Sequence, residues 1–293
     1  MKKPFVNWEE IEMLARPPMP QGRATLEKMP GKGLEGWNNQ APGYNKIAEL
    51  EKEFTINQLD CLDITSDDTV LDVCCGPGRI SVPAAKRAKQ VTSLDASSKM
   101  LEFCMAYAQR EGVDNITPVH ADWEDETAIA KVPKHDIVIA SRNLAMFDTD
   151  RLSALANKCV AIVIWSFGCP SVPAVTYQLF KNTRADEQAG PRRFPGLGKD
   201  RRLGNNLVYN KIYDKGYNPN LRIVDDGFMK TYSSYEEAYD DLRVLGPEVD
   251  KDRENIYREN VNRFITENQD GTVTFLAKTG SIVLWWKPEK EEI

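Results

Sequence analysis

The chain has 293 residues, a formal net charge of −6 at pH 7, 41% hydrophobic residues and 28% charged residues. Such a composition supports a packed core and excludes a largely disordered chain. The acidic balance argues against a nucleic-acid binder, which usually carries a basic excess. No stretch approaches the roughly 18 apolar residues of a membrane span, and no signal-peptide pattern opens the chain. We therefore expect a cytoplasmic protein with neither a membrane nor a nucleic acid as partner, and the oligomeric state stays open.

The first 36 residues hold five prolines and four glycines, which predicts a mostly irregular N-terminal arm. This arm is either a packing extension or a flap over an active site. The segment Trp37-Asn-Asn-Gln-Ala-Pro-Gly-Tyr44 follows it. Helical spacing of apolar residues then extends from Ile47 to Leu62, and we expect this helix to pack on a sheet.

Residues 69–95 carry the most informative pattern. A short apolar strand ends at Gly76-Pro77-Gly78, a helical pattern follows, and a second strand ends on Asp95. Two glycines let the backbone turn and approach a ligand, and the next helix points unpaired N–H groups at the same place. An acid at the tip of the second strand can accept both hydroxyls of a ribose. The stretch therefore predicts a cofactor that contains a nucleoside.

Two cofactor classes compete for this turn. Gly76-x-Gly78-x-x-Ser81, with Asp95 downstream, nearly fits the dinucleotide pattern of an NAD(P)-dependent oxidoreductase. Asp72 stands against this interpretation, because a carboxylate there would repel a pyrophosphate and attract the ammonium of a methionine group. The third position of the pattern is also Ser81 instead of glycine or alanine.

Further strands are expected at 116–119, 135–140 and 160–165, each rich in β-branched residues and separated by helical segments. Five parallel strands with intervening helices predict a doubly wound α/β sheet. Ligands bind beyond the carboxyl ends of such strands. The loop 141–148 follows the fourth strand, so it should face the ligand.

Between residues 168 and 221 the periodicity weakens, prolines and glycines mark loops, and basic residues outnumber acidic ones. A long insertion in a compact domain is usually functional. A basic lid suggests an anionic acceptor, whose carboxylate or phosphate Arg192 and Arg193 would bind. A solvated charged loop is the alternative.

The C-terminal part, from residue 222 onward, predicts a strand over 222–232 and two helices over 235–245 and 252–267. Residues 272–277 and 281–286 flank Lys278-Thr279-Gly280 and indicate a hairpin.

Three segments resemble the class I S-adenosylmethionine-dependent methyltransferases. LDVCCGPGRISVPAA resembles their first motif, hydrophobic-Asp-x-x-x-Gly-x-Gly, VTSLDASSKML their second and HADWED their third. The resemblance covers residues 37–166 and implies a seven-stranded, mostly parallel sheet with an antiparallel last strand. It also implies S-adenosylmethionine as cofactor and S-adenosylhomocysteine as product. The expected parts are an N-terminal arm (1–36), a cofactor-binding core (37–167), an inserted acceptor lid (168–221) and a C-terminal completion of the sheet (222–293).

The resemblance also implies the roles of individual residues. The cofactor-binding candidates are Tyr44, Asp72, Cys74, Gly76, Pro77, Gly78, Asp95, Ala96, Met100, Asp122, Trp123, Ser141, Arg142 and Asn143. The acceptor-side candidates are Trp37, Met146, Arg192 and Arg193. The expected reaction moves the sulfonium methyl to an O, N, S or C nucleophile of a small acceptor, which the basic lid suggests is anionic. No metal-ligand cluster and no catalytic base stand out, so alignment should carry the reaction. An oxidoreductase and a regulatory module that binds the cofactor without catalysis are the alternatives.

Overall fold

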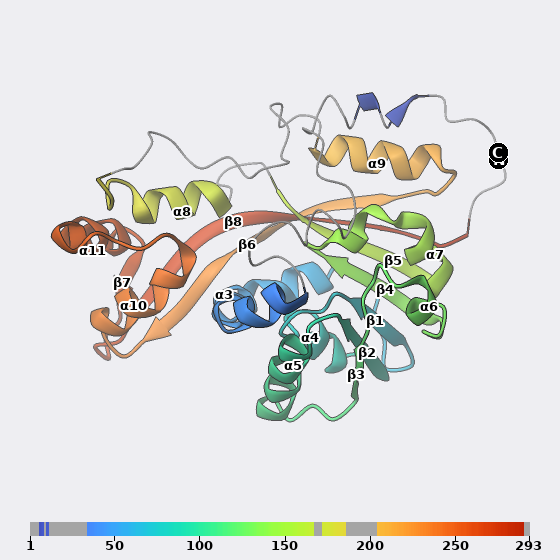
Figure 1. Ribbon diagram of the computed structural model, residues 1–293, viewed down its shortest axis with the longest axis horizontal. Helices are drawn as coiled ribbons and strands as arrows, with labels where there is room; N and C mark the ends of the chain where they lie inside the picture. The colour runs from blue at the N-terminus through green and yellow to red at the C-terminus, as the bar shows by residue number, and fades with distance from the viewer. Residues whose placement is uncertain (1–5, 9, 12–33, 167–171, 186–203, 290–293) are drawn as a thin grey trace.

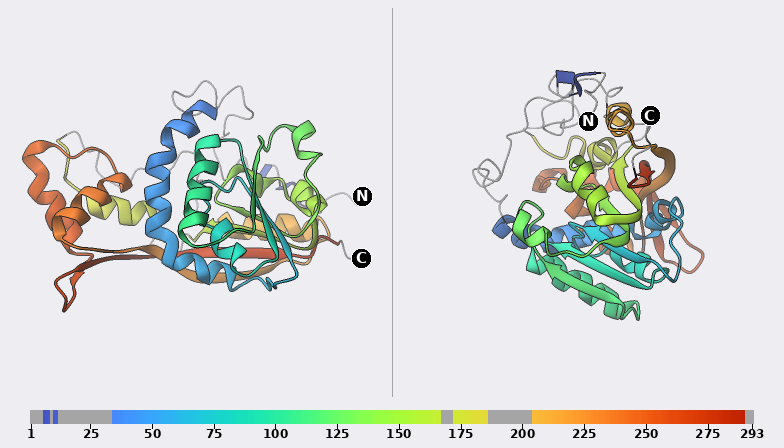
Figure 2. Two further views of the ribbon diagram at one scale, coloured as in Figure 1. Left: turned by 90° about the horizontal axis from the view of Figure 1, so that it is seen from below. Right: turned by 90° about the vertical axis from the view of Figure 1, so that its right-hand side faces the viewer.

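The computed structural model describes residues 6–8, 10–11, 34–166, 172–185 and 204–289. They form a central sheet with helices on both faces and a smaller lobe beyond one end of the sheet (Figure 1, Figure 2). Within these ranges, no helix combines the length and the apolar character needed to cross a bilayer. Arg192 and Arg193, together with most of the expected arm, lie outside the described residues.

Five strands form the parallel half of the sheet: β1 (Thr69–Val73), β2 (Gln90–Asp95), β3 (Ile116–His120), β4 (His135–Ser141) and β5 (Ala156–Trp165). Val70 shows the register, because it pairs with Val91 of β2 on one side and with Ile137 of β4 on the other. All three residues are buried. Strands that are buried on both faces read as continuous apolar runs, which is why the sequence pattern located them.

The strand order is β3-β2-β1-β4-β5-β8-β6. After β3 the chain crosses to β4 on the other side of β1, so the carboxyl ends of β1, β2 and β4 meet at the point where the order reverses. Ligands of open α/β sheets bind at such a point. The expected doubly wound, mostly parallel sheet is confirmed, and its antiparallel strand is β8 (Val273–Trp286).

β8 is one continuous strand, so the expected hairpin around Lys278-Thr279-Gly280 is wrong. β6 (Asn220–Tyr232) runs antiparallel to β8, and its residues Asp225–Gly227 pair with these three. A partner strand of nearly equal length satisfies the backbone groups without a turn. A Cβ on Gly280 would lie 3.3 Å from that of Ser166, so this glycine permits close packing. The short β7 (Ile265–Glu267) also pairs with β8.

Helices cover both faces of the sheet. Leu59, Val82 and Ala108 are buried on one face and come from α3 (Leu34–Leu59), α4 (Ser81–Ala85) and α5 (Ser98–Arg110). Leu152 and Ile212 are buried on the other, from α7 (Thr149–Leu155) and α9 (Gly204–Asp214). The short α6 (Glu126–Ile129) and the 3₁₀-helix η1 (Leu144–Phe147) follow β3 and β4.

The smaller lobe is built where β6 and β8 run beyond the parallel strands (Figure 2). Phe228, Tyr257 and Phe275 are central to its separate apolar core. Its helical segments are α8 (Val172–Phe180), α10 (Tyr235–Leu242), η3 (Arg243–Leu245), η4 (Lys251–Arg253) and α11 (Glu254–Asn262). The boundaries of the arm, core, lid and C-terminal part stay a prediction.

Candidate functional site

The glycine turn after β1 has the backbone conformation that its glycines predict. Cys74, Gly76 and Gly78 all have left-handed φ values, of 51°, 56° and 86°. A Cβ on Gly78 would lie 2.6 Å from the Sγ of Cys104 in α5, so only glycine lets the turn approach this helix. A side chain at Gly76 would enter the space beside Tyr44, because its Cβ would lie 3.9 Å from that ring. The Tyr44 ring therefore packs close to the backbone of the glycine turn at Gly76.

Asp95 lies at the carboxyl end of β2 and braces the glycine turn. Its Oδ2 accepts a hydrogen bond from the Gly76 N–H at 2.8 Å, and its Oδ1 accepts one from the Ser97 N–H at 2.8 Å. Burial raises the pKa of Asp95, although these bonds oppose the shift. Each carboxylate oxygen retains further acceptor capacity. Asp95 can therefore accept ribose hydroxyls, as the sequence predicts, while Ala96 lies next to it in the turn.

Asp72 lies deeper than the sequence suggested. The residue is 1% exposed, and its carboxyl group accepts a hydrogen bond from the Ser81 hydroxyl at 2.6 Å. Burial raises its pKa to about 7. Ser93 in turn donates to Ser81, so the group belongs to a buried polar cluster below the turn. Its predicted attraction for a cofactor ammonium stays a prediction.

The first half of α3 lies beside the turn that follows β2. The Asn38 Oδ1 accepts a hydrogen bond from the Ser97 Oγ at 2.7 Å, which attaches α3 to the N-cap of α5. Trp37 and Tyr44 meet edge to face, with ring centroids 6.1 Å apart, and remain 44% and 36% exposed. Desolvation and the nearby Glu51 raise the pKa of Tyr44, so its phenol keeps its proton at neutral pH. The neutral Tyr44 ring thus lies beside the glycine turn, and its contact with the cofactor stays a prediction.

The loop after β4 lies against the end of β1, at the point where the strand order reverses. The Asn143 amide donates to the Val73 carbonyl at 2.7 Å and accepts from the Ala145 N–H at 3.0 Å. It therefore connects the end of β1 to η1. The Arg142 N–H lies 3.2 Å from the Sδ of Met146, which places the predicted residues 141–146 together at this edge. Their contact with the cofactor or acceptor stays a prediction.

Trp123 and Met100 are both 3% exposed and belong to the protein interior. The Arg151 guanidinium lies 5.0 Å from the centre of the Trp123 ring. The Asp122 carboxylate accepts from the Glu124 N–H at 3.0 Å within its own turn and stays half-buried. Asp122 is thus available at the end of β3, whereas a Trp123 stack on adenine would require the ring to leave its apolar cluster. Both contacts stay predictions.

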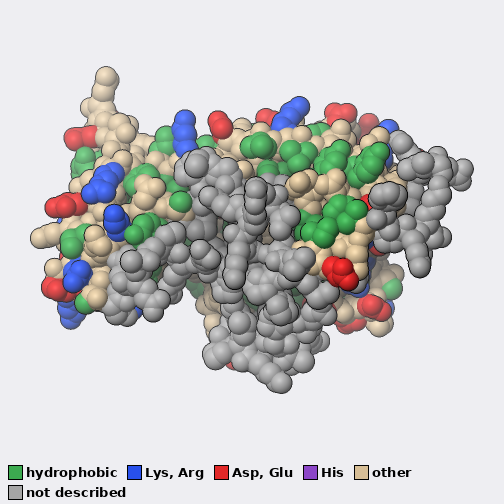
Figure 3. Space-filling view, turned by 90° about the horizontal axis from the view of Figure 1, so that it is seen from above, with side chains coloured by type: hydrophobic (Ala, Val, Ile, Leu, Met, Phe, Trp, Pro, Cys, Tyr) green, Lys and Arg blue, Asp and Glu red, His purple; other side chains and the backbone are tan. Residues whose placement is uncertain are grey.

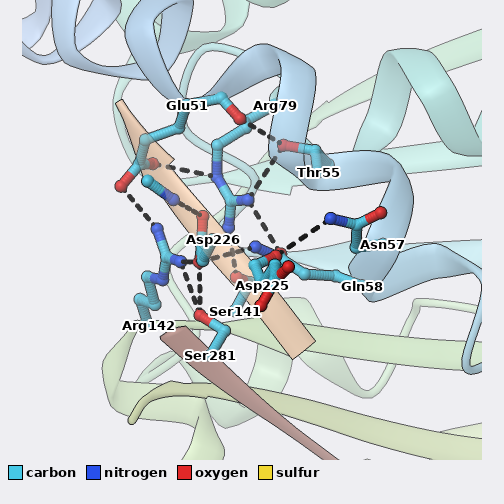
Figure 4. A network of polar contacts seen from close by, with 11 residues as sticks. Glu51, Thr55, Asn57, Gln58, Arg79, Ser141, Arg142, Asp225, Asp226 and Ser281 are labelled. Atoms are coloured by element: carbon cyan, nitrogen blue, oxygen red, sulfur yellow. Dashed lines mark hydrogen bonds and ion pairs between the residues drawn. The ribbon is translucent and has the colours of Figure 1, made fainter. Parts of the chain in front are cut away.

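A buried ion-pair network borders the site and was not expected from the sequence (Figure 4). Arg142 pairs with Glu51 of α3 and with Asp226 of β6, while Arg79 approaches Glu51 at 3.4 Å. Breaking one partner of a buried pair typically costs about 3–5 kcal/mol, because the other charge is left unpaired. The sequence offers a local indication for Arg79, since this residue directly follows the glycine turn. The sequence offers no such indication for Asp226, because this residue is 84 positions from its partner Arg142.

Comparison with known proteins identifies the core of the fold. A family profile described as a methyltransferase domain matches residues 70–163. An uncharacterized protein of Haemophilus influenzae is 31% identical over 218 residues, which cover 70% of this chain and 71% of that protein. The 23S rRNA (uracil(1939)-C(5))-methyltransferase RlmD of Alcanivorax borkumensis is 41% identical over 89 residues, or 30% of this chain and 20% of that enzyme. Magnesium protoporphyrin IX methyltransferase of Synechocystis, crystallised with S-adenosylmethionine, superposes with a TM-score of 0.40 at 14% identity and covers 84% and 80% of the two chains.

The relatives that are named 23S rRNA methyltransferases contradict one expectation. A small-molecule acceptor without nucleic acid was expected, partly from the acidic net charge, and this expectation is wrong. Net charge sums the whole surface, whereas a nucleic-acid contact depends on local charge and stacking. On the face in Figure 3, the acidic and basic side chains of the described residues are interspersed, so the net charge does not characterise any single surface.

Proposed function

This chain belongs to the class I S-adenosylmethionine-dependent methyltransferases, and we propose that its acceptor is a nucleobase carried by RNA. S-adenosylmethionine is its cofactor and S-adenosylhomocysteine its product. Neither an NAD(P)-dependent oxidoreductase nor a regulatory module without catalysis finds support among the relatives. The cytoplasmic location stays a prediction.

The residues at the carboxyl ends of β1 and β2 suit the cofactor. The left-handed glycine turn presents its backbone without side chains at Gly76 and Gly78, and Asp95 offers acceptor lone pairs to a ribose. We assign the nucleoside to Asp95 and the backbone of Gly76 and Gly78, with Asp122 on the adenine side. When bound, the cofactor supplies an electrophilic methyl group on its sulfonium.

The protein's own part in the reaction is then alignment and exclusion of water. Alignment of two reactants can lower a barrier by about 7–11 kcal/mol. Asn143 contributes to it by holding the loop after β4 against the end of β1. Tyr44, which stays protonated, contributes a ring surface and no basic group.

The exposed ring of Trp37 is the observation that supports a nucleobase acceptor. Trp37 projects from α3, keeps 44% of its surface exposed and packs edge to face on Tyr44. Proteins bind unpaired bases by stacking them on such rings, at about 1–3 kcal/mol per base. The names of the rRNA-methylating relatives agree with this assignment, although their matches span 20% and 28% of the first two such enzymes.

The test measures transfer of a tritiated methyl group from S-adenosylmethionine to two pools: ribosomal RNA transcribed in vitro, and an RNA-free extract of small metabolites. We expect label in RNA that ribonuclease releases, and no transfer by Asp95→Ala. Trp37→Ala should lower transfer to RNA at least tenfold. Tyr213→Ala is the matched control, because Tyr213 is an exposed aromatic on α9, 54% exposed. Label in the metabolite pool alone would overturn the RNA assignment.

A further inference from the structure

The ion-pair network beside the cofactor site joins five parts of the fold (Figure 4). Its charged members are Glu51 of α3, Arg79 after the glycine turn, Arg142 after β4 and Asp226 of β6. The Arg142 and Asp226 side chains are 3% and 2% exposed, and that of Glu51 is 9% exposed. Ser281 of β8 completes it by contacting Arg142 at 2.8 Å.

Arg79 connects the glycine turn to α3 and to β4. Its Nη1 donates to the Thr55 hydroxyl at 3.1 Å and to the Gln58 Oε1 at 2.8 Å, both on α3. Its Nη2 donates to the Ser141 hydroxyl at 2.6 Å, at the last residue of β4. A guanidinium presents its donors in a rigid fork, so these bonds fix the relative places of three elements.

Arg142 makes the corresponding connection from the loop after β4. Its Nη1 donates to the Glu51 Oε1 at 2.6 Å, and its Nη2 contacts Asp226. Its φ of 56° is left-handed, which is uncommon for a side chain of this size. The Gln58 amide also donates to Asp226, at 3.0 Å, so both ends of the network return to α3.

One side of α3 carries both the network and the aromatic pair. Trp37, Tyr44, Glu51 and Gln58 recur every seventh residue, which places them on the same side of the helix. Pro42 lies inside this continuous helix between the two aromatic residues and provides no N–H for the backbone ladder. The part of α3 that follows Pro42 contains Tyr44 and also the residues anchored in the network. The position of the Tyr44 ring therefore depends on the contacts of Glu51, Thr55 and Gln58.

We propose that Arg79 and Arg142 are positioning residues for methyl transfer: through Glu51 they hold α3 so that the Tyr44 ring faces the glycine turn. This inference rests on the proposed function and on the contact between Tyr44 and the cofactor that the family resemblance predicts. It predicts that loosening the network lowers cofactor affinity, although no member of the network needs to touch the cofactor. A network that only stabilised the fold would change stability and leave the affinity of the folded protein unchanged.

The test compares S-adenosylhomocysteine binding by calorimetry in two variants that each neutralise a buried carboxylate. Glu51→Gln removes the charge that both arginines share. Asp68→Asn is the matched control: its side chain is 1% exposed and pairs with Lys158 at the amino end of β1, away from the glycine turn. We expect Glu51→Gln to raise the Kd at least tenfold, and Asp68→Asn to change it less than twofold, although both should lower the urea midpoint.

A milder variant covers the case in which Glu51→Gln does not fold. Thr55→Val keeps the shape of a fully buried side chain but removes the hydroxyl that accepts from Arg79, so the Kd should rise about threefold. Unchanged affinity in folded Glu51→Gln or Thr55→Val, with binding abolished in Asp95→Ala, would overturn the inference and leave the cofactor site intact. A second outcome separates the two proposals. If Glu51→Gln loses affinity while the wild-type protein transfers no methyl group to RNA, the positioning role is supported and only the acceptor assignment is rejected.

Discussion

Gly78→Ala tests whether the glycine turn is constrained by close packing as well as by backbone conformation. The φ of Gly78 is 86°, and a left-handed conformation costs a residue with a Cβ about 1–2 kcal/mol. The new Cβ would also lie 2.6 Å from the Sγ and 3.2 Å from the Cα of Cys104. Because a helix backbone cannot move aside cheaply, overpacking adds about 1–3 kcal/mol. We expect Gly78→Ala to lower the free energy of unfolding by about 2–5 kcal/mol in total.

Gly112→Ala isolates the conformational part of this cost. Its φ of 69° is also left-handed, but a Cβ there would meet no atom within 4 Å. Gly112→Ala should therefore lower the free energy of unfolding by only about 1–2 kcal/mol. The assay is urea unfolding of both variants, with S-adenosylhomocysteine binding measured in parallel. We expect lower affinity in Gly78→Ala alone, since α5 carries the Ser97 cap that Asp95 contacts. Equal stability losses in the two variants would refute the packing argument.

Two further predictions concern buried polar groups at the site. The pKa of Asp72 rises from 3.8 to about 7, so the native state binds a proton that the unfolded chain releases. This stabilisation is complete below pH 3.8 and is lost as the pH rises to about 7. Over this pH interval the free energy of unfolding should fall by about 4 kcal/mol. Asp72→Asn cannot ionise, so its unfolding free energy should lack this decline; parallel pH profiles from urea titrations would contradict the assignment. Asn143→Asp would place an oxygen 2.7 Å from the Val73 carbonyl where an amide now donates, and should cost about 1–3 kcal/mol in thermal unfolding. Melting at the wild-type temperature would show that this bond is dispensable.

The arrangement of the glycine turn and Asp95 could be predicted from the sequence because these parts are close along the chain, whereas their contact with the cofactor stays a prediction. Gly76, Gly78 and Asp95 belong to two consecutive strands, and the Gly76–Asp95 bond spans 19 residues. The types of residue also carry the signal directly, since glycine marks the left-handed turn and an acid ends the next strand. The parallel strands were found for the related reason that burial on both faces requires an apolar run.

The network and the long antiparallel strand pair could not be found in this way. Arg142 meets Glu51 across 91 residues and Asp226 across 84, and no local pattern marks the partners of a single arginine. Lys278-Thr279-Gly280 has the composition of a turn, but it stays extended because β6 supplies a partner for each residue. The acceptor was also misjudged, because net charge is a property of the whole chain and a site is local.

The sequence by itself therefore determined the fold class, the cofactor and the conformation of the glycine turn, because these depend on periodicity and on residues adjacent in one βαβ unit. Only the tertiary structure decided how α3 is held over that turn and which charges are buried beside it. The physical reason is that a buried charge is tolerated only where partners from other elements converge on it. That convergence is a property of the assembled sheet and is absent from any single segment of the chain.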